Sequence, residues 1–469
     1  MNTTHEPGAE RADTLVLFGI TGDLSKKKLI PALYRLAATD RLPSAVVGVA
    51  RTEWNVDEFR GHVRDSIDAA GLQPEAEVLD RLLARLSYVQ GDYRHGDTFE
   101  RVAEAIDGVH LPVFYFAIPP DMFDDVVGGL VATGIHEGAR VVLEKPFGRD
   151  LRSARELNQL LHRHFPESAI FRIDHFLGKE AVQNLMVFRF ANTILDPVWN
   201  RYYVDNVQIT LAESFGIEGR GAFYDEVGAL RDVVQNHLLQ VLALLTMEPP
   251  ATDDPEALRD EIGKVTRAVR PFDPADVVRG QFVGYQDEKG VADGSETETF
   301  VALRAHVDSW RWADVPFYIR AGKSMASTVT EAIVELKRPP RPMFTAGAHV
   351  PDPNRLRFRL KPDDTITVGM QAKRPGEELL SMPVDLLLTE PPGVGEGVEA
   401  YERLLDDALD GDPRLFARQD AVEAAWKAVQ PVLDSPPDLE TYEVGSWGPA
   451  AADRLLPEQA WSPCAVPDS

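Results

Sequence analysis

Cysteine, positive charge and long apolar runs are all scarce in this chain of 469 residues. Its one cysteine, Cys464, can form no internal disulfide and leaves no thiolate cluster for zinc. Lys and Arg total 49 against 75 Asp and Glu, a formal charge of −26 at pH 7 that would repel nucleic acid and anionic membranes on average. The longest apolar stretch, near Leu238 to Met247, is far shorter than the ~20 residues that cross a bilayer, and the first residues lack a secretory signal. We therefore expect a cytoplasmic protein with neither a nucleic-acid nor a membrane partner.

What the chain does contain is typical of a globular protein of several domains, with 44% hydrophobic and 26% charged residues. Short apolar runs alternate with helical patterns in the first third of the chain: Thr14 to Phe18, Val46 to Ala50, Leu86 to Gln90, Val113 to Ala117 and Val141 to Glu144. Near-continuous apolar strands separated by helices predict a parallel sheet covered on both faces. We expect a disordered segment over residues 1–12 and a Rossmann-like, doubly wound α/β domain over residues 13–174.

The pattern changes after Asp174 to longer strands with alternating character. Leu356, Phe358 and Leu360 alternate with arginines, and Val207, Ile209 and Leu211 indicate a second half-exposed strand. Further strands are expected at Thr299 to Val307, Glu331 to Lys337, Thr365 to Met370 and Val384 to Thr389, and helices at Glu226 to Met247 and Ala421 to Val432. Residues 175–469 are therefore predicted to form an α+β domain with a large, mostly antiparallel sheet. The Pro/Gly-rich runs near Pro339 and Pro391 are expected to be surface loops.

The first predicted strand runs into a glycine turn, Gly19-Ile-Thr-Gly-Asp-Leu24, where a strand meets the next helix. Such a turn directs backbone N–H groups at a pyrophosphate. The G-x-G-x-x-G spacing is met only at Gly19, because Thr21 and Leu24 occupy the other glycine positions. A tight structural turn is an equal alternative.

Two basic residues follow other strands of the same domain. The second strand ends at Arg51, where an NAD-binding chain usually carries an acidic residue, so Arg51 favours a 2′-phosphate. The alternative is a surface arginine. Lys145 follows the strand at Val141 to Glu144 and would face the ligand crevice that lies beyond strand ends, or else occupy a simple turn before Pro146.

An acid, an imidazole and an ammonium group occur within six residues at the predicted domain junction. They are Asp174, His175 and Lys179. On a helix, His175 and Lys179 would share a face and could clamp one anionic group. An interdomain ion-pair cluster is the alternative.

A second cluster of polar residues follows in the C-terminal domain. Glu213 ends a predicted strand, Lys323 ends another, and Asp232 and His237 lie on the helix predicted at Glu226 to Met247. Asp232 and His237 are five residues apart, about 140° around an α-helix, so each needs another partner. A histidine beside a carboxylate is a common general base for a hydroxyl proton, and a histidine hydrogen-bonded inside a helix–sheet interface is the commoner alternative.

Several motifs, taken in order, resemble the glucose-6-phosphate dehydrogenase family: FGITGDLSKKKLIPALYRL, ARTEW, FAIPP, EKPFG, RIDHFLGKE, RDVVQNH and VPFYIRAGK. The resemblance covers nearly the whole chain and implies oxidation at C1 of glucose 6-phosphate, with hydride transfer to NADP, or possible use of NAD, and no metal. It implies His237 as the general base and Asp174 as the carboxylate that orients it. The cofactor residues implied are Gly19, Thr21, Gly22, Asp23, Leu24, Arg51 and Lys145. The substrate residues implied are Lys145, His175, Lys179, Glu213, Asp232 and Lys323.

Two positions depart from the family pattern, in which Phe176 is usually Tyr and Thr328 is usually basic. Loss of a phosphate hydrogen bond and of a cation would suit a different sugar phosphate, such as glucosamine 6-phosphate, with its cationic amine. A weakly catalytic NADP-binding regulator is a third hypothesis, against which the presence of both Asp174 and His237 argues. The family's broad sheet also implies a homodimer or homotetramer.

Overall fold

The computed structural model describes residues 10–341, 343–344, 350–388, 397–456 and 460–464. They belong to two compact units. The first unit contains Met1–Lys179, Ala251–Arg259 and Gly397–Val422, and the second unit contains Glu180–Pro250, Asp260–Glu396 and Glu423–Ser469. Residues 1–9 of the predicted disordered segment and the predicted loop at Pro391 lie outside the described residues.

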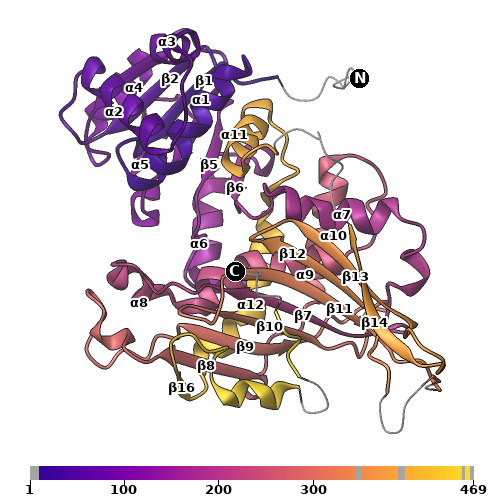
Figure 1. Ribbon diagram of the computed structural model, residues 1–469. Coiled ribbons are helices and arrows are strands. Elements are labelled where there is room, and N and C mark those ends of the chain that lie inside the picture. Colours follow the sequence, from indigo (N-terminus) through magenta and orange to yellow (C-terminus); the bar gives the residue numbers. More distant parts are fainter. Residues whose placement is uncertain (1–9, 342, 345–349, 389–396, 457–459, 465–469) are drawn as a thin grey trace. The chain divides into compact units, whose positions relative to one another are not determined.

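The first unit is built on a seven-stranded sheet of order β15-β6-β5-β4-β1-β2-β3 (Figure 1). Its strands are β1 (Thr14–Phe18), β2 (Ala45–Ala50), β3 (Leu86–Gln90), β4 (Pro112–Phe116), β5 (Arg140–Leu143), β6 (Ile170–Ile173) and β15 (Phe416–Ala417). The first six are parallel, and β15 pairs antiparallel with β6. All residues of β1 and β4 are buried, as expected of strands covered on both faces. The predicted doubly wound sheet is thus confirmed, with β6 and β15 as additions.

Helical segments connect these strands. They are η1 (Ser25–Leu29), α1 (Ile30–Ala38), α2 (Val56–Ala69), α3 (Ala76–Ala84), α4 (Gly96–Ala105), η2 (Pro120–Met122), α5 (Phe123–Ala132), α6 (Leu151–His162), η3 (Glu167–Ala169) and, late in the chain, α11 (Ala400–Asp410). Reciprocal capping boxes begin α2 at Asn55 and α6 at Asp150, which satisfy amide groups that have no partner within the helix.

Helix α11 is attached to the first unit by ion pairs and backbone acceptors. Asp406 lies 2.6 Å from Arg41 and 2.9 Å from Arg11, both near the start of the chain. The Arg140 guanidinium donates to the carbonyl of Leu409 at 2.7 Å. Arg140 and Leu409 are 269 residues apart, so a segment far along the chain completes the packing around the N-terminal sheet.

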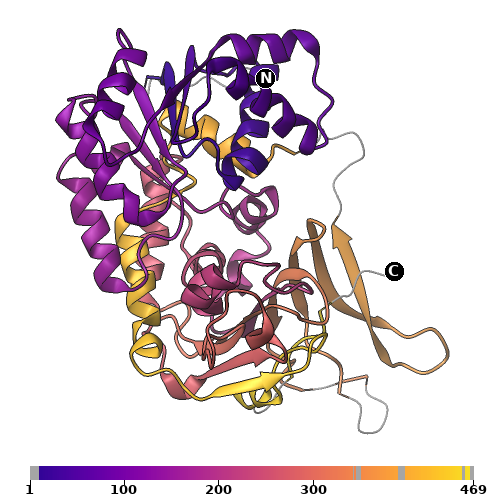
Figure 2. The ribbon, with the colours of Figure 1, turned by 90° about the vertical axis from the view of Figure 1, so that its left-hand side faces the viewer.

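The second unit contains a nine-stranded sheet of order β14-β13-β12-β11-β7-β10-β9-β8-β16, whose β13 and β14 are orange in Figure 2. Its strands are β7 (Val204–Ala212), β8 (Val277–Phe282), β9 (Phe300–Ala305), β10 (Phe317–Gly322), β11 (Val329–Leu336), β12 (Arg355–Lys361), β13 (Thr365–Lys373), β14 (Ser381–Leu388) and β16 (Leu439–Tyr442). Only the β7–β10 and β8–β16 pairs are parallel among these neighbours. The predicted mostly antiparallel sheet is confirmed, although Thr389 of the last predicted strand lies outside the described residues.

Two strands with similar sequence patterns differ in burial. In β12, Leu356, Phe358 and Leu360 are buried and the intervening arginines are partly exposed, as predicted. The prediction of a half-exposed β7 was wrong, because this strand is central in the sheet and its polar residues are buried too. Thr210, for example, accepts a hydrogen bond from Arg320 at 3.1 Å.

The helix predicted over Glu226 to Met247 is not continuous. It consists of α8 (Gly221–Ala229), the π-helical η5 (Leu230–Leu238) and α9 (Leu239–Thr246). Gly228, with φ 68° and ψ 170°, breaks the helical path because this conformation is open essentially to glycine alone. The apolar pattern of a helix continues on both sides of Gly228, so the break could not be predicted from the sequence.

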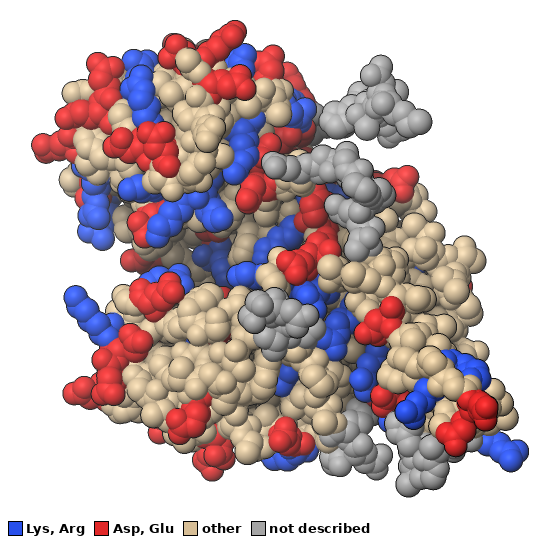
Figure 3. Space-filling model, in the orientation of Figure 1, with Lys and Arg blue, Asp and Glu red and all other residues tan. Residues whose placement is uncertain are grey.

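The remaining helical segments are α7 (Glu180–Ala191), η4 (Asp196–Val198), α10 (Pro255–Ala268), η6 (Pro274–Asp276), η7 (Tyr285–Asp287), α12 (Gln419–Asp434) and η8 (Ala450–Leu455). Helix α12 confirms the helix predicted at Ala421 to Val432. Among the described residues, no helix combines the length and the apolar character needed to span a membrane. On the face shown in Figure 3, acidic and basic side chains are interspersed.

Candidate active site

The predicted cofactor turn joins β1 to a helical segment in the first unit. Gly19 has φ +83°, and a Cβ atom there would lie 2.1 Å from the Ala117 carbonyl oxygen, so only glycine fits. The Gly19 carbonyl accepts hydrogen bonds from the Gly22 amide at 2.9 Å and the Ser25 hydroxyl at 2.9 Å. This turn contains the predicted cofactor residues Gly19, Thr21, Gly22, Asp23 and Leu24.

Arg51 lies directly after β2, which neighbours β1 in the sheet. Its side chain is exposed, and within the described residues its guanidinium has no hydrogen bond or ion pair. Because both strands are parallel, Arg51 and the glycine turn lie at the same edge of the sheet, next to the point between β1 and β4 where the strand order reverses. Open α/β sheets bind dinucleotides at such a point, and the exposed cation fits a phosphate group.

Lys145 follows β5, in a cis peptide bond with Pro146. The preceding Glu144 is buried, and its carboxylate accepts a hydrogen bond from the Tyr115 hydroxyl at 2.5 Å and another from Tyr401. Burial raises the pKa of Glu144 to about 7, although both tyrosine hydroxyls and Lys145 oppose the rise. Sequence reasoning included Glu144 in a predicted strand and in the EKPFG motif but assigned no role to this buried carboxyl group.

Asp174, His175 and Lys179 occupy consecutive turns after β6. The Leu177 amide donates to the Asp174 carbonyl at 3.0 Å, and the Lys179 amide donates to the Phe176 carbonyl at 3.1 Å. Helix α7 begins only at Glu180, so the helical spacing considered for His175 and Lys179 does not apply. Asp174 is 3% exposed, and its Oδ1 accepts the Phe176 amide at 3.0 Å.

Aromatic rings surround the groups of this turn. The His175 ring lies edge-on to Phe176, with centroids 5.3 Å apart, and stacks on Tyr401 at 6.2 Å. The Lys179 ammonium lies 3.8 Å from the centroid of the Phe176 ring, within the range of a cation–π interaction. Phe176 therefore keeps an electrostatic contact with Lys179 without a tyrosine hydroxyl.

The second unit brings Glu213, Asp232 and Lys323 together. Because β7 and β10 are parallel neighbours, Glu213 and Lys323 follow at the same edge of the sheet. The Lys323 ammonium hydrogen-bonds to the Glu213 carboxylate and lies 3.8 Å from Asp232. Lys323 is only 5% exposed, and its ammonium group lies 5.5 Å from the centroid of the Tyr224 ring. The result is a buried cation held between two acids.

Two further hydrogen bonds at this cluster were not predicted from the sequence. The Tyr442 hydroxyl donates to the Lys323 carbonyl at 2.7 Å. Thr328 Oγ1 accepts the Ser214 amide at 3.0 Å, next to Glu213. Thr328 thus fixes the loop that follows β7.

His237 is 2% exposed and lies on η5 with Asp232. The separation of 140° expected for these two residues assumed an α-helix, whereas η5 is a π-helix, in which hydrogen bonds join residues five apart. The expectation that Asp232 has another partner is confirmed by its ion pair with Lys323. Asp174 belongs to the first unit and His237 to the second, and their pairing remains a prediction.

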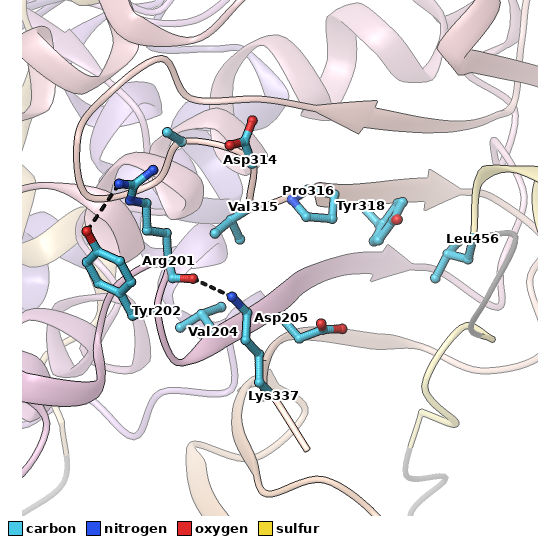
Figure 4. A pocket seen from close by; sticks show the side chains of 11 residues that line it. Arg201, Tyr202, Val204, Asp205, Asp314, Val315, Pro316, Tyr318, Lys337 and Leu456 are labelled. Carbon is cyan, nitrogen blue, oxygen red and sulfur yellow. Dashed lines mark hydrogen bonds between the residues drawn. The ribbon is translucent and has the colours of Figure 1, made fainter. Parts of the chain in front are cut away.

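A cavity of about 510 Å³ lies at the other end of β7 and β10 (Figure 4). Its lining includes Arg201, Asp205, Asp314 and Lys337, and the Lys337 ammonium donates to the Arg201 carbonyl at 2.7 Å. None of the predicted site residues lines it. The candidate active-site groups of the second unit instead lie at the carboxyl ends of these parallel strands.

The parallel sheet, with its glycine turn and an exposed cation beside the point where the strand order reverses, is the architecture of a dinucleotide-binding protein. A family model, "Glucose-6-phosphate dehydrogenase, NAD binding domain", matches residues 16–184, and "Glucose-6-phosphate dehydrogenase, C-terminal domain" matches residues 186–462. The chain belongs to the glucose-6-phosphate dehydrogenase family.

Known relatives match over nearly the whole chain. Glucose-6-phosphate 1-dehydrogenase 1 of Mycobacterium tuberculosis is 45% identical over 454 residues, which cover 96% of each chain. The crystal structure of glucose-6-phosphate 1-dehydrogenase from Mycobacterium avium is 44% identical, covers 98% of this chain and 100% of that one, and has a TM-score of 0.91. A glucose-6-phosphate dehydrogenase in complex with its substrate glucose 6-phosphate is 35% identical over the same shares, with a TM-score of 0.89.

Proposed function

We propose that this chain oxidises C1 of glucose 6-phosphate to 6-phosphogluconolactone and transfers the hydride to NADP, the first step of the oxidative pentose phosphate pathway. The observation that carries the proposal is the full-length match to glucose-6-phosphate 1-dehydrogenases, among them a structure with glucose 6-phosphate bound. Glucosamine 6-phosphate and a purely regulatory role are the less favoured alternatives, since these relatives carry the name of the enzyme itself.

The first unit supplies the cofactor site. NADP, when bound, is the hydride acceptor. The glycine turn from Gly19 to Leu24 binds the pyrophosphate at the start of a helix. The amides of Gly19 and Gly22 donate within the protein and hold the turn in shape, so the other amides of the turn face the ligand. Arg51 binds the 2′-phosphate, which gives preference for NADP while still permitting NAD.

His237 is the general base that takes the proton of the C1 hydroxyl group. A neutral imidazole suits this step because its ordinary pKa lies near neutrality. Asp174 orients the ring and stabilises the imidazolium that forms. Removal of the hydroxyl proton makes the C1 hydride a better leaving group, so the two transfers assist one another.

The remaining polar groups bind the sugar phosphate. His175 and Lys179 bind the phosphate, because hydrogen bonds from charged donors to phosphate oxygens are strong. Glu213, Asp232 and Lys323 bind the sugar hydroxyls, and their mutual hydrogen bond and ion pair hold them ready for that contact. Lys145 lies between sugar and nicotinamide.

We further propose that the protein works in the cytoplasm as a homodimer or homotetramer. Support comes from β14 at the edge of the nine-stranded sheet, where Leu386 is 56% and Leu387 is 58% exposed. Apolar side chains on an edge strand are commonly covered by another chain.

The test is NADPH formation by purified protein with glucose 6-phosphate, and separately with glucosamine 6-phosphate, for the wild type and His237→Asn. Loss of the general base should lower kcat by roughly 10²- to 10⁴-fold. His110→Asn, an exposed histidine of the first unit, is the matched control and should keep full activity. Binding of NADP without turnover of either sugar would contradict the proposal and favour the regulatory role.

A further inference from the structure

The backbone around Arg51 is held by an unusual set of hydrogen bonds. The carbonyls of four consecutive residues, Val49 to Thr52, all accept hydrogen bonds, although Arg51 and Thr52 lie beyond the end of β2. The Ala50 carbonyl accepts the Gly91 amide at 2.9 Å, as in a continuing sheet. The other three carbonyls accept side-chain donors from β3 and the loop after it, and these donors are Tyr88, Gln90 and Tyr93.

Tyr93 joins the glycine turn to the end of β2. Its hydroxyl accepts the Gly19 amide proton at 2.8 Å and donates to the Val49 carbonyl at 3.0 Å. The Gly19 amide also lies 3.0 Å from that carbonyl, which closes a triangle of three polar groups. The ring is buried edge-on against Phe18, with centroids 5.6 Å apart. Burial raises the pKa of Tyr93 to about 12, so the hydroxyl keeps the proton that it donates.

Tyr88 holds the residue after Arg51. Its hydroxyl donates to the Thr52 carbonyl at 2.7 Å. Its ring lies between Phe59, with centroids 5.3 Å apart, and Trp54, at 5.9 Å, which fixes the direction of the hydroxyl. Burial also raises the pKa of Tyr88 to about 12.

Gln90 completes the set. Its Nε2 donates to the Arg51 carbonyl at 3.3 Å. Arg51 itself is exposed, and an exposed segment past a strand end is mobile unless its backbone is tied down. Tyr88, Gln90 and Tyr93 provide that restraint through the backbone and leave the guanidinium group open to a ligand.

We infer that Tyr88 and Tyr93 are positioning residues that fix Arg51 relative to the glycine turn and so set the preference for a dinucleotide with a 2′-phosphate over one without it. The inference rests on the proposed function, because it assigns Arg51 to that phosphate. Neither tyrosine needs to touch the cofactor. Both act on it through the backbone that carries Arg51.

The experiment compares NADP with NAD for the variants Tyr88→Phe, Tyr93→Phe and the double variant. Each loses one hydroxyl group and keeps its ring. For the double variant we expect the ratio of kcat/KM for NADP to kcat/KM for NAD to fall roughly tenfold, because the two hydroxyl groups hold the backbone through the hydrogen bonds to Gly19, Val49 and Thr52. The kcat with NAD and the KM for glucose 6-phosphate should stay unchanged.

The matched control is Tyr34→Phe, whose buried hydroxyl accepts the Glu75 amide at 2.9 Å in the same unit. This variant loses a comparable hydrogen bond away from Arg51 and should keep the wild-type ratio. Tyr88→Phe alone serves if loss of the Tyr93 hydroxyl prevents folding, because the Tyr88 hydroxyl bond is exposed. An equal loss of activity with NADP and NAD would overturn the inference.

A second set of variants tests whether the tyrosines act through Arg51. In an Arg51→Ala background, the two Tyr→Phe substitutions should cause no further fall in the NADP to NAD ratio. Independent effects that add to that of Arg51→Ala would contradict the inference. Titration of each dinucleotide against the protein without sugar, by calorimetry, separates the two proposals. If the wild type binds NADP more tightly but turns over no sugar phosphate, the proposed function fails and the positioning role can still be measured.

Discussion

At the scale of single residues, some groups of the site could be predicted from the sequence and others could not. Lys323 and Glu213 come from segments 110 residues apart and form a hydrogen-bonded pair. The sequence placed each of the two residues at a strand end, but neither their pairing nor the rings of Phe215 and Tyr224 near the ammonium were predicted. An ammonium group that is hydrogen-bonded to one acid and lies near a second is held in a fixed position, which suits the recognition of sugar hydroxyls.

Phe176 gives the sharpest prediction for one residue. Phe176→Tyr adds a hydroxyl group to a ring that already faces Lys179, and we expect it to lower the KM for glucose 6-phosphate roughly two- to tenfold, the effect of one hydrogen bond. The value of kcat should not change. Phe176→Leu removes the ring beneath the ammonium and should raise the same KM. Steady-state kinetics at varied concentrations of glucose 6-phosphate measures these KM values. An unchanged KM in both variants would contradict a role for this position in phosphate binding.

At the scale of elements, the break at Gly228 shapes the segment that carries Asp232 and His237. Directly after it, the Leu230 amide donates to Glu298 Oε1 at 3.1 Å, and the Ala229 amide donates to the Glu298 carbonyl at 3.0 Å. Glu298 therefore acts as a cap for the π-helical turn. The glycine permits the backbone to approach Glu298 closely enough for both bonds.

We predict that Gly228→Ala destabilises the protein. An added Cβ would lie 2.6 Å from Glu298 Oε1, and the φ and ψ angles are strained for alanine, so the free energy of unfolding should fall by about 1 to 3 kcal/mol. Gly128→Ala, an exposed position inside α5 with open space around it, is the control and should be neutral or slightly stabilising. Urea unfolding of both variants measures the difference. Equal stability would show that the backbone at Gly228 relaxes without cost.

The elements also show how far the sequence could predict this structure. The strands from Thr14 to Leu143 were found because parallel strands read as continuous apolar runs. Strand β6 was missed, since Arg172 interrupts its four residues, yet Arg172 is buried in an ion pair with Glu167 at 2.7 Å. Glu213 and Lys323 were each placed at the end of a strand, but their contact was not predicted, because the order of the strands in the second sheet could not be derived from the sequence. No role was predicted for Tyr88, Gln90 and Tyr93, because their role depends on which strand lies beside β2.

At the scale of the whole molecule, a formal charge of −26 means that some acidic side chains lie close to one another and repel. Helix α11 carries several acids, and two of them, Asp406 and Asp410, are paired with arginines. Asp407 differs, because burial, assisted by the neighbouring Asp412 and Asp406, raises its pKa to about 7. The folded state thus holds a proton on Asp407 that the unfolded chain releases near pH 4.

This difference makes stability depend on pH. A raised pKa contributes stability that is complete below the unfolded pKa and is lost as the pH rises through the folded pKa, here between about pH 4 and pH 7. Asp407→Asn imitates the protonated acid, so it should be more stable than the wild type at pH 8, by up to about 4 kcal/mol, and similar to it near pH 4. Denaturant midpoints at several pH values test this. A difference between the two proteins that is constant with pH would exclude titration of Asp407 as the cause.

The first unit is assembled from three stretches of chain, the last of which ends at Val422. On the ribosome, 243 residues separate its first break at residue 179 from residue 422, and at ordinary rates of synthesis this interval lasts roughly 10 to 50 s. During that time the acceptors of Arg140 on α11 and the partner strand of β6 do not yet exist. The first strands of this sheet are therefore synthesised early, but the sheet is completed late. Until then the edge of the sheet at β6 has no partner strand, and we expect a chaperone to bind the nascent chain there.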